Sequence, residues 1–422
     1  MSKEDLKGKK LLVLAGADVH IKVVKAAQEL GVYTIVTDYL SPEDAPAKKV
    51  ADEYWMLDIM DVEGIVAKCK EANVDAVLSF CIDPAQKPYQ EICKRLGFPC
   101  YGTKQQFDIF TSKRLFKDFC VAHGVDVIPE YSEMDVKKGT VEYPLLVKPS
   151  VSRGSRGQTV CFSSDEVFSA IEIAKEESGD SRFIIERYMG GKQDMSFAYC
   201  VINREPYLVK CGDRILGESR DHLERQQIAT VLPSIHSNQF VTEIEPRIKQ
   251  MIKSLGVEFG AVFMQGFWDD GRVFMYDPGL RFPGSDYDIV LKEDTGYDNM
   301  KTFVYYSLTG DTSCCFGTPE NAFQLNGRAC LILSIALRPG RLTTISGFDQ
   351  IASHPWVRSS SLRHHVGDVI PDSGDIKQRA AEFIVSLPDI SYKDCFIKEV
   401  YHSIRFLDEN GKDMIVSKVQ ID

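Results

Sequence analysis

The sequence has no long apolar segment. Its longest nearly apolar run, residues 329–337, is interrupted by Ser334 and falls well short of the roughly 18 residues that a membrane-spanning helix needs. The first ten residues carry charges without the apolar region of a secretory signal behind them. We therefore expect a cytoplasmic protein without a membrane segment.

The sequence also lacks the cysteine patterns of zinc and disulfide sites. Its twelve cysteines include no C-x-x-C pair, and its eight histidines do not lie near cysteine at zinc-finger spacing. A structural zinc site is therefore not expected. The cysteines are typical of reduced thiols that behave as small, mostly buried hydrophobic residues.

Two common phosphate-binding motifs and an excess of positive charge are missing as well. The turn at residues 15–18 reads Ala-Gly-Ala-Asp rather than G-x-G-x-x-G, and no G-x-x-x-x-G-K-[ST] occurs. With 50 Lys and Arg against 61 Asp and Glu, the net charge of −11 opposes binding to nucleic acid or to an anionic membrane. A small substrate at the ends of the first strands is still compatible with this pattern.

What is present is the composition of an ordinary folded protein, with 44% apolar and 26% charged residues. The 422 residues suffice for two or three domains of about 150 residues. Over the first hundred residues, strands at 11–15, 33–37 and 75–80 alternate with helical patterns whose apolar residues recur at i, i+3, i+4 and i+7. This order predicts a parallel, doubly wound α/β sheet.

From about residue 111 the pattern changes to α+β. A helix opens at Ser112, and strands at 145–148 and 159–163 flank a glycine-rich loop. Two later strands, 261–268 and 272–277, predict a hairpin with a turn at Asp269-Asp270-Gly271. The chain from about residue 327 is strand-rich, with a helix-like stretch at 376–385.

The glycine-rich loop carries the most informative local chemistry. It reads Ser150-Val151-Ser152-Arg153-Gly154-Ser155-Arg156-Gly157, so it combines free backbone amides, hydroxyl groups and two cations. An exposed hairpin tip would have a similar composition. Lys148 ends the apolar strand before the loop, which points its ammonium group toward the loop's mouth and favours a loop that closes over a polyphosphate.

The order of the polar motifs resembles the ATP-grasp superfamily. Ser112-Lys113, Lys148 with the glycine-rich loop, residues 186–189 with Asp194, and then Gln265, Asp277 and Arg281 follow one another along the chain. Within the superfamily, the chain is similar to the group that contains biotin carboxylase, carbamoyl phosphate synthase halves, the purine carboxylase PurK and bacterial L-amino acid ligases.

The resemblance implies three domains and a fold of the α/β plus α+β class. Residues 1–110 would form a pre-ATP-grasp, Rossmann-like domain with a parallel sheet. Residues 111–325 would form the ATP-grasp domain, with a mobile lid subdomain at about 130–190. Residues 326–422 would form a strand-rich, half-barrel-like domain.

The resemblance also implies a nucleotide site. Lys113 and Lys148 would hold ATP phosphates, a hinge at residues 186–189 would meet the adenine, and Asp194 would accept from the ribose hydroxyls. Residues 152–157 would be the lid. The implied nucleotide-binding residues are Lys113, Lys148, Ser152, Arg153, Gly154, Ser155, Arg156, Gly157, Glu186, Arg187, Tyr188, Met189 and Asp194.

A Mg²⁺ site, with Mn²⁺ as an alternative ion, is implied at Gln265 and Asp277. These residues lie on opposite arms of the predicted hairpin, where their oxygens can converge on an ion that bridges phosphates. The group usually has Glu-x-Asn-x-Arg where this chain reads Asp277-Pro278-Gly279-Leu280-Arg281, so Gly279 supplies no ligand atom. Arg281 would act with Lys148 as a catalytic residue by steadying the transferring phosphoryl group.

The activity implied is an ATP-dependent ligase that forms a C–N bond. A carboxylate would become an acyl phosphate, because phosphate turns one of its oxygens into a leaving group, and an amine or another nitrogen nucleophile would then attack. The expected partners are small molecules, and homodimers are common in the resembling group. Asp213-Arg214 fits either a substrate or phosphate contact or a surface ion pair.

Three alternatives stay open. Biotin-carboxylase activity would need a partner carrier, because the chain has no Ala-Met-Lys-Met segment. Activation of bicarbonate, as in carbamoyl phosphate synthase, is favoured by Gln265. A nucleotide-binding regulatory protein without turnover is favoured by Gly279.

Overall fold

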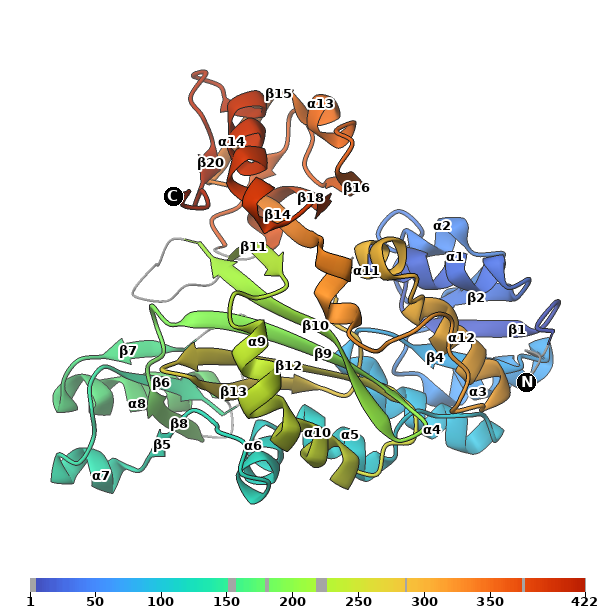
Figure 1. Cartoon of the computed structure of the whole chain (residues 1–422), viewed down its shortest axis with the longest axis horizontal. Helices are drawn as coiled ribbons and strands as arrows, with labels where there is room; N and C mark the ends of the chain where they lie inside the picture. Colours follow the sequence, from blue (N-terminus) through green and yellow to red (C-terminus); the bar gives the residue numbers. More distant parts are fainter. Residues whose placement is uncertain are drawn as a thin grey trace.

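The computed structural model describes residues 5–150, 157–178, 182–217, 226–284, 287–373 and 376–421. Figure 1 shows a long central sheet with a parallel sheet beside one end, a small sheet beside the other, and the C-terminal elements above it. None of the described helices is long and apolar enough to cross a membrane. Most of the twelve cysteines are buried, as the sequence predicts.

The first hundred residues form the parallel sheet. Its strands lie in the order β3 (Glu53–Trp55), β2 (Tyr33–Thr37), β1 (Lys10–Leu14) and β4 (Ala76–Ser79). The helices around it are α1 (Ile21–Glu29), α2 (Ala47–Val50), α3 (Val62–Ala72) and α4 (Gln86–Leu96). The predicted α/β order is confirmed. The sequence pattern misses β3, because only Trp55 of its three residues is buried and no apolar run marks it.

The next elements build a small antiparallel sheet with its own core. After α5 (Lys104–Thr111), α6 (Lys113–Ala122) begins where predicted, and the Ser112 hydroxyl caps it by accepting from the Leu115 amide. The small sheet beside one end of the central sheet has its strands in the order β5 (Glu130–Tyr131), β8 (Phe183–Arg187), β6 (Leu145–Pro149) and β7 (Thr159–Cys161), with α7 (Glu133–Lys138) and α8 (Ser164–Ser178). A separate apolar cluster of this sheet and α8 supports a lid subdomain there.

The central sheet is antiparallel throughout. Its strands lie in the order β13 (Arg272–Gly279), β12 (Gly260–Asp269), β9 (Gln193–Ile202), β10 (Glu205–Leu216), β11 (Gln227–Leu232), β14 (Ala329–Leu337), β18 (Arg379–Leu387) and β16 (Val357–Leu362), with β20 (Ile415–Val416) beside β14. The hairpin of β12 and β13 is confirmed, and its turn residues Asp270 and Gly271 have φ of 48° and 76°. Because β11 pairs with β14, the predicted boundary near residue 326 falls within one continuous sheet. The division into three domains stays a prediction.

The two faces of the central sheet differ in character. One face packs on the π-helix η3 (Phe240–Ile244) and on α10 (Glu245–Ser254), and the rings of Phe197 and Phe240 stack there at 4.3 Å. Successive strand residues point to opposite faces, so Ser196 on β9 points away from this helical layer. Lys210 and Arg214 on β10 lie on the same face as Ser196, as the ladder pairs of the two strands show. This second, more polar face lines the two cavities that are described in the next section.

The C-terminal region is strand-rich, as predicted, but the helix expected at 376–385 is wrong. Ile376–Gln378 is a single 3₁₀ turn, and β18 follows it directly. Ala and Glu near the start of β18 favour helix locally, yet β18 pairs with β14 on one side and β16 on the other. Tertiary pairing overrides the local propensity.

The remaining α-helices and strands are α9 (Ser237–Gln239), α11 (Tyr287–Thr295), α12 (Asn299–Thr309), β15 (Gly340–Ser346), α13 (Phe348–Ala352), β17 (Val369–Ile370), α14 (Lys393–Ser403) and β19 (Arg405–Asp408).

Candidate active site

A cavity of about 250 Å³ lies between the small sheet and the central sheet. We call it the small cavity. Most of the implied nucleotide residues meet there, although they come from α6, β6, β8, β9 and the β8–β9 connection. The predicted site residues that line it are Lys113, Lys148, Glu186, Arg187, Tyr188, Met189, Asp194 and Asp277.

The charge of Lys148 is held by Glu186, a diagonal neighbour on β8, where Glu186 itself pairs with Leu146 and Lys148 pairs with Ile184. The Lys148 ammonium group donates to the Glu186 carboxylate, and both side chains are buried. Lys117, one helical turn after Lys113, donates to the other oxygen of Glu186 at 3.1 Å. Burial raises the pKa of Glu186, but Lys148 and Lys117 outweigh it, so the net pKa is lowered and the carboxylate stays ionised.

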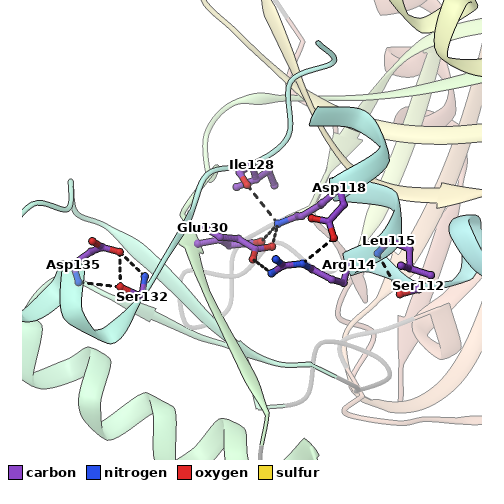
Figure 2. A network of polar contacts seen from close by, with 10 residues as sticks. Ser112, Arg114, Leu115, Asp118, Ile128, Glu130, Ser132 and Asp135 are labelled. Atoms are coloured by element: carbon purple, nitrogen blue, oxygen red, sulfur yellow. Dashed lines mark hydrogen bonds and ion pairs between the residues drawn. The ribbon is translucent and has the colours of Figure 1, made fainter. Parts of the chain in front are cut away.

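The same network ties α6 to β5 (Figure 2). Lys117 also donates to Glu130 at 2.5 Å, and Glu130 is the ladder partner of Glu186. Figure 2 shows Arg114 between Asp118 and Glu130, with Arg114 Nε 3.2 Å from the Asp118 carboxylate. Helix α6 therefore carries the lysines of the site from a position fixed against the small sheet.

The predicted hinge has the backbone groups that an adenine edge needs. The Tyr188 amide donates to the Pro144 carbonyl at 3.2 Å, whereas the Met189 amide bonds to none of the described residues. The Met189 side chain is buried against Ile128 and faces the small cavity. The Tyr188 ring folds back over Gly190, where a Cβ would approach it to 2.1 Å, so only glycine fits this position.

Asp194 lies in β9 and not in a turn. Its carboxylate accepts from Arg214 at 2.5 Å and from the Tyr276 hydroxyl at 3.1 Å. Arg214 is half-buried and also donates to the Gln227 side chain at 3.1 Å. The alternative of a surface ion pair between Asp213 and Arg214 is wrong, because the two side chains occupy opposite faces of β10 and Asp213 instead accepts from Ser234.

Gln265 and Asp277 are direct ladder partners on β12 and β13, so their side chains share one face of the sheet. Neither side chain has a hydrogen bond or ion pair to the described residues, although Asp277 is half-buried in the small cavity. Burial raises the pKa of Asp277 against the opposing effect of Lys113 and Arg281. One carboxylate and one amide oxygen without internal partners fit a hard cation that takes its other ligands from phosphate and water. Within the described residues, no three His, Cys, Asp or Glu side chains cluster as a metal site.

A second cavity, of about 950 Å³, adjoins the small one and shares Arg214 with it. We call it the large cavity. One wall comes from loops after β1 and β2 of the parallel sheet, which carry Asp18, Glu43 and Asp44. The strand ends of the first sheet therefore face this cavity, and a substrate there stays a prediction. The floor and the opposite wall come from the central sheet and include Ser196, Lys210, Gln265, Arg363, Arg379 and Glu382.

Arg281 lies outside both cavities. Its guanidinium group binds Asp83 through two hydrogen bonds of 2.5 and 2.9 Å, and it donates to the Phe282 carbonyl at 2.8 Å. The structure therefore joins the implied catalytic arginine to the parallel-sheet domain. Of the implied lid, Ser152, Arg153, Gly154, Ser155 and Arg156 lie outside the described residues. Gly157 is described, and it adopts φ of 66° against Pro149.

Several residues of the site escape the sequence analysis. Lys117 could have been found, because it lies four residues after Lys113 on the same helical face. Lys210 and Arg214 are also four residues apart, which places both on one face of a strand. Arg363 and Arg379 carry no local signal, because only the pairing of β14, β18 and β16 brings them to the large cavity.

The fold, in which a small sheet lies beside a long antiparallel sheet with a cavity between them, agrees with the resemblance to the ATP-grasp superfamily. Residues 115–261 match the family described as carbamoyl-phosphate synthase L chain, ATP binding domain. The resemblance found in the sequence is confirmed.

Curated proteins with similar sequences are consistent with this resemblance. The formate-dependent phosphoribosylglycinamide formyltransferase of Bacillus subtilis (strain 168) is 27% identical over 243 residues, which cover 52% of this chain and 60% of that protein. The chain spans 48% to 60% of the curated relatives that it matches first.

Solved structures show the same fold over nearly the whole chain. An L-amino acid ligase from Bacillus licheniformis has a TM-score of 0.76 at 16% identity and covers 97% of this chain and 100% of that one. The biotin carboxylase domain of Hydrogenobacter thermophilus 2-oxoglutarate carboxylase, in complex with MgADP and bicarbonate, has a TM-score of 0.72 at 18% identity, covering 94% and 91%.

Proposed function

We propose that this protein is an ATP-dependent ligase that activates a carboxylate as an acyl phosphate and transfers the acyl group to an amine. The observation that carries the proposal is the shared position of Arg214 between the two cavities. A nucleotide in the small cavity and a carboxylate in the large cavity would meet beside this guanidinium group. That arrangement suits transfer of a phosphoryl group from one ligand to the other.

The small cavity supplies the nucleotide contacts. Lys113 and Lys148 would neutralise phosphate charge, the Met189 amide would donate to the adenine, and Asp194 would accept from the ribose hydroxyls. Glu186 holds the Lys148 ammonium group in place, so the lysine would meet the phosphates without reorganisation. The residues of the lid, Ser152 to Gly157, complete this proposed site.

Gln265 and Asp277 are the residues that would hold Mg²⁺. Asp277 lines the small cavity and Gln265 lines the large one, so these two residues would hold the ion close to both proposed ligands. A bound Mg²⁺ would supply neutralisation of the phosphate charge. Arg281 would join these residues only by exchanging Asp83 for phosphate oxygens.

The acidic wall of the large cavity favours an amine as the nucleophile. Asp18, Glu43 and Asp44 would attract an ammonium ion and would repel bicarbonate. The cationic side chains across the cavity suit the carboxylate. The polarity of the cavity therefore favours a carboxylate–amine ligase over a bicarbonate-activating enzyme.

The test is an ADP-release screen with amino acids, dicarboxylates and bicarbonate, each with and without amine acceptors. We expect release that requires both a carboxylate and an amine, with equimolar phosphate. Release with bicarbonate alone would instead identify a bicarbonate-activating enzyme. ATP binding without stimulated release by any pair would identify a regulatory protein.

A further inference from the structure

Lys210 is a buried lysine on the floor of the large cavity. It lies in the middle of β10, on the same face as Arg214, and is only 4% exposed. Its ammonium nitrogen lies 5.1 Å from the centroid of the Tyr287 ring. A lysine at this depth faces either the cavity or the protein core, and it lines the cavity.

The surroundings of Lys210 disfavour its charged form. Burial lowers the pKa of Lys210 to about 8, and Arg214 and Lys22 add to this effect, against weaker opposite contributions from Cys330 and Asp288. The carboxylate of Asp288 is already engaged by Lys22 and by Asn299. The positive charge of Lys22 therefore opposes the electrostatic stabilisation that Asp288 gives to protonated Lys210.

A second polar group on the same floor has no internal partner. The Ser196 hydroxyl is buried, lines the large cavity and has no hydrogen bond to the described residues. Ser196 pairs across the sheet with Gln265 on one side and Gly212 on the other. A buried hydroxyl without a partner is costly, so its presence here points to a substrate atom as the missing partner.

We propose that Lys210 is the catalytic base that takes the proton from the attacking amine. The inference rests on the proposed ligase function and names one residue of its second step. An amine reaches the cavity as an ammonium ion, which has no electron pair for attack. Neutral Lys210 would accept one proton from it and become an ammonium ion itself. The amine nitrogen would then bond to the acyl carbon as the bond to phosphate breaks, and inorganic phosphate leaves.

The position of Lys210 suits this step. The acidic wall that would attract the ammonium ion and the Arg214 side chain that would lie beside the acyl phosphate line the same cavity as Lys210. A base is most effective when its pKa lies near the working pH. Lys148 is less suited to this role, because its ammonium group is engaged by Glu186 and it lines the small cavity instead.

The test compares two nucleophiles in the variants Lys210→Met and Lys210→Arg. Methionine keeps the length of the side chain without its amine, and arginine keeps a charge that does not dissociate at these pH values. Hydroxylamine is uncharged at neutral pH and needs no base. We expect both variants to lose about a hundredfold or more in turnover with an ordinary amine, and to form the hydroxamate with hydroxylamine at nearly the wild-type rate.

The control is Lys253→Met, which removes an exposed lysine of α10 that pairs with Glu205. We expect this variant to behave as wild type with both nucleophiles. We also expect the wild-type kcat/KM for the amine to rise with pH up to about 8, and this limb to disappear in Lys210→Met. Equal losses with both nucleophiles, no loss with the amine, or full activity of Lys210→Arg would overturn the role of Lys210. If the wild-type protein forms no hydroxamate with any carboxylate, the proposed function itself fails.

Discussion

The two cavities each contain a buried lysine, and the charged groups described around the two lysines differ. Lys148 in the small cavity has Glu186 as a direct partner, which is shared with Lys117. Lys210 in the large cavity has Arg214 and Lys22 among the groups that shift its pKa downward. Both are buried strand residues, so burial alone does not determine the role of a lysine. Burial lowers the pKa of both lysines; Glu186 opposes this effect at Lys148, whereas Arg214 adds to it at Lys210.

The largest effect on activity is expected at the paired lysine. Lys148→Ala should abolish measurable ATP turnover, a loss of at least about a hundredfold, because the phosphates lose a preorganised charge. Glu186 keeps Lys117 as its partner, so the variant should still fold. ADP release and circular dichroism measure the two effects, and Lys175→Ala on the surface of α8 is the matched control. Full ATP affinity and turnover in Lys148→Ala would refute the assignment of the small cavity.

The largest effect on stability is expected at Glu186. Glu186→Ala leaves Lys148 and Lys117 buried with the charge of Glu130 alone nearby. Breaking a buried ion pair from one side costs about 3–5 kcal/mol. Denaturant unfolding of the variant should show this loss, and nucleotide binding should weaken as well. A variant as stable as wild type would mean that the two lysines do not depend on Glu186.

At Lys210 the effect on stability should have the opposite sign. The pKa of Lys210 falls from 10.5 in the unfolded chain to about 8 in the fold. Below pH 8 the lysine is charged in both states, so the lowered pKa reduces the free energy of unfolding there. Lys210→Met should therefore raise the free energy of unfolding by about 3 kcal/mol at pH 7. The gain should shrink between pH 8 and 10.5, as the wild-type lysine becomes neutral, and a destabilised variant at pH 7 would contradict the account.

A smaller effect is expected at the junction of the cavities. Asp277→Asn removes the one carboxylate at the proposed Mg²⁺ position. Turnover should fall by about tenfold or more, while ATP affinity should change little, because Lys113 and Lys148 remain. Calorimetry with and without nucleotide can show whether Mg²⁺ binding depends on ATP. Tight binding of Mg²⁺ to the nucleotide-free protein would place the metal elsewhere.

The smallest effect is expected at Gly279, where this chain departs from its group. Gly279 does not have positive φ, so a side chain is compatible with its backbone. An added Cβ would lie 3.1 Å from Cγ of Arg281, a flexible side chain that can move. Gly279→Asn should therefore fold and should lower the Mg²⁺ concentration needed for half-maximal turnover by a few-fold at most. No change in this concentration would mean that position 279 does not face the metal.

The small cavity could be predicted well from the sequence, and the large one could not. Lys148 ends an apolar strand beside a glycine-rich loop, and Asp277 lies opposite Gln265 on a short hairpin, so local patterns identify these residues. Lys210 lies in a long buried strand and Arg379 begins a strand that reads as a helix. Only the pairing of β10, β11, β14 and β18 brings these two residues to one cavity. Long-range pairing of this kind leaves no periodic mark in the sequence.

The most direct test of the central claim follows the carboxylate oxygen. The acid that gives the largest ADP release in the screen is prepared with isotopically heavy oxygen in its carboxylate and is incubated with ATP, Mg²⁺ and the amine. Formation of an acyl phosphate followed by amine attack transfers one of these oxygens to inorganic phosphate, and the account predicts one heavy oxygen in each phosphate released. Phosphate that carries no heavy oxygen would contradict the account, because the carboxylate would not have been the group that received the phosphoryl group.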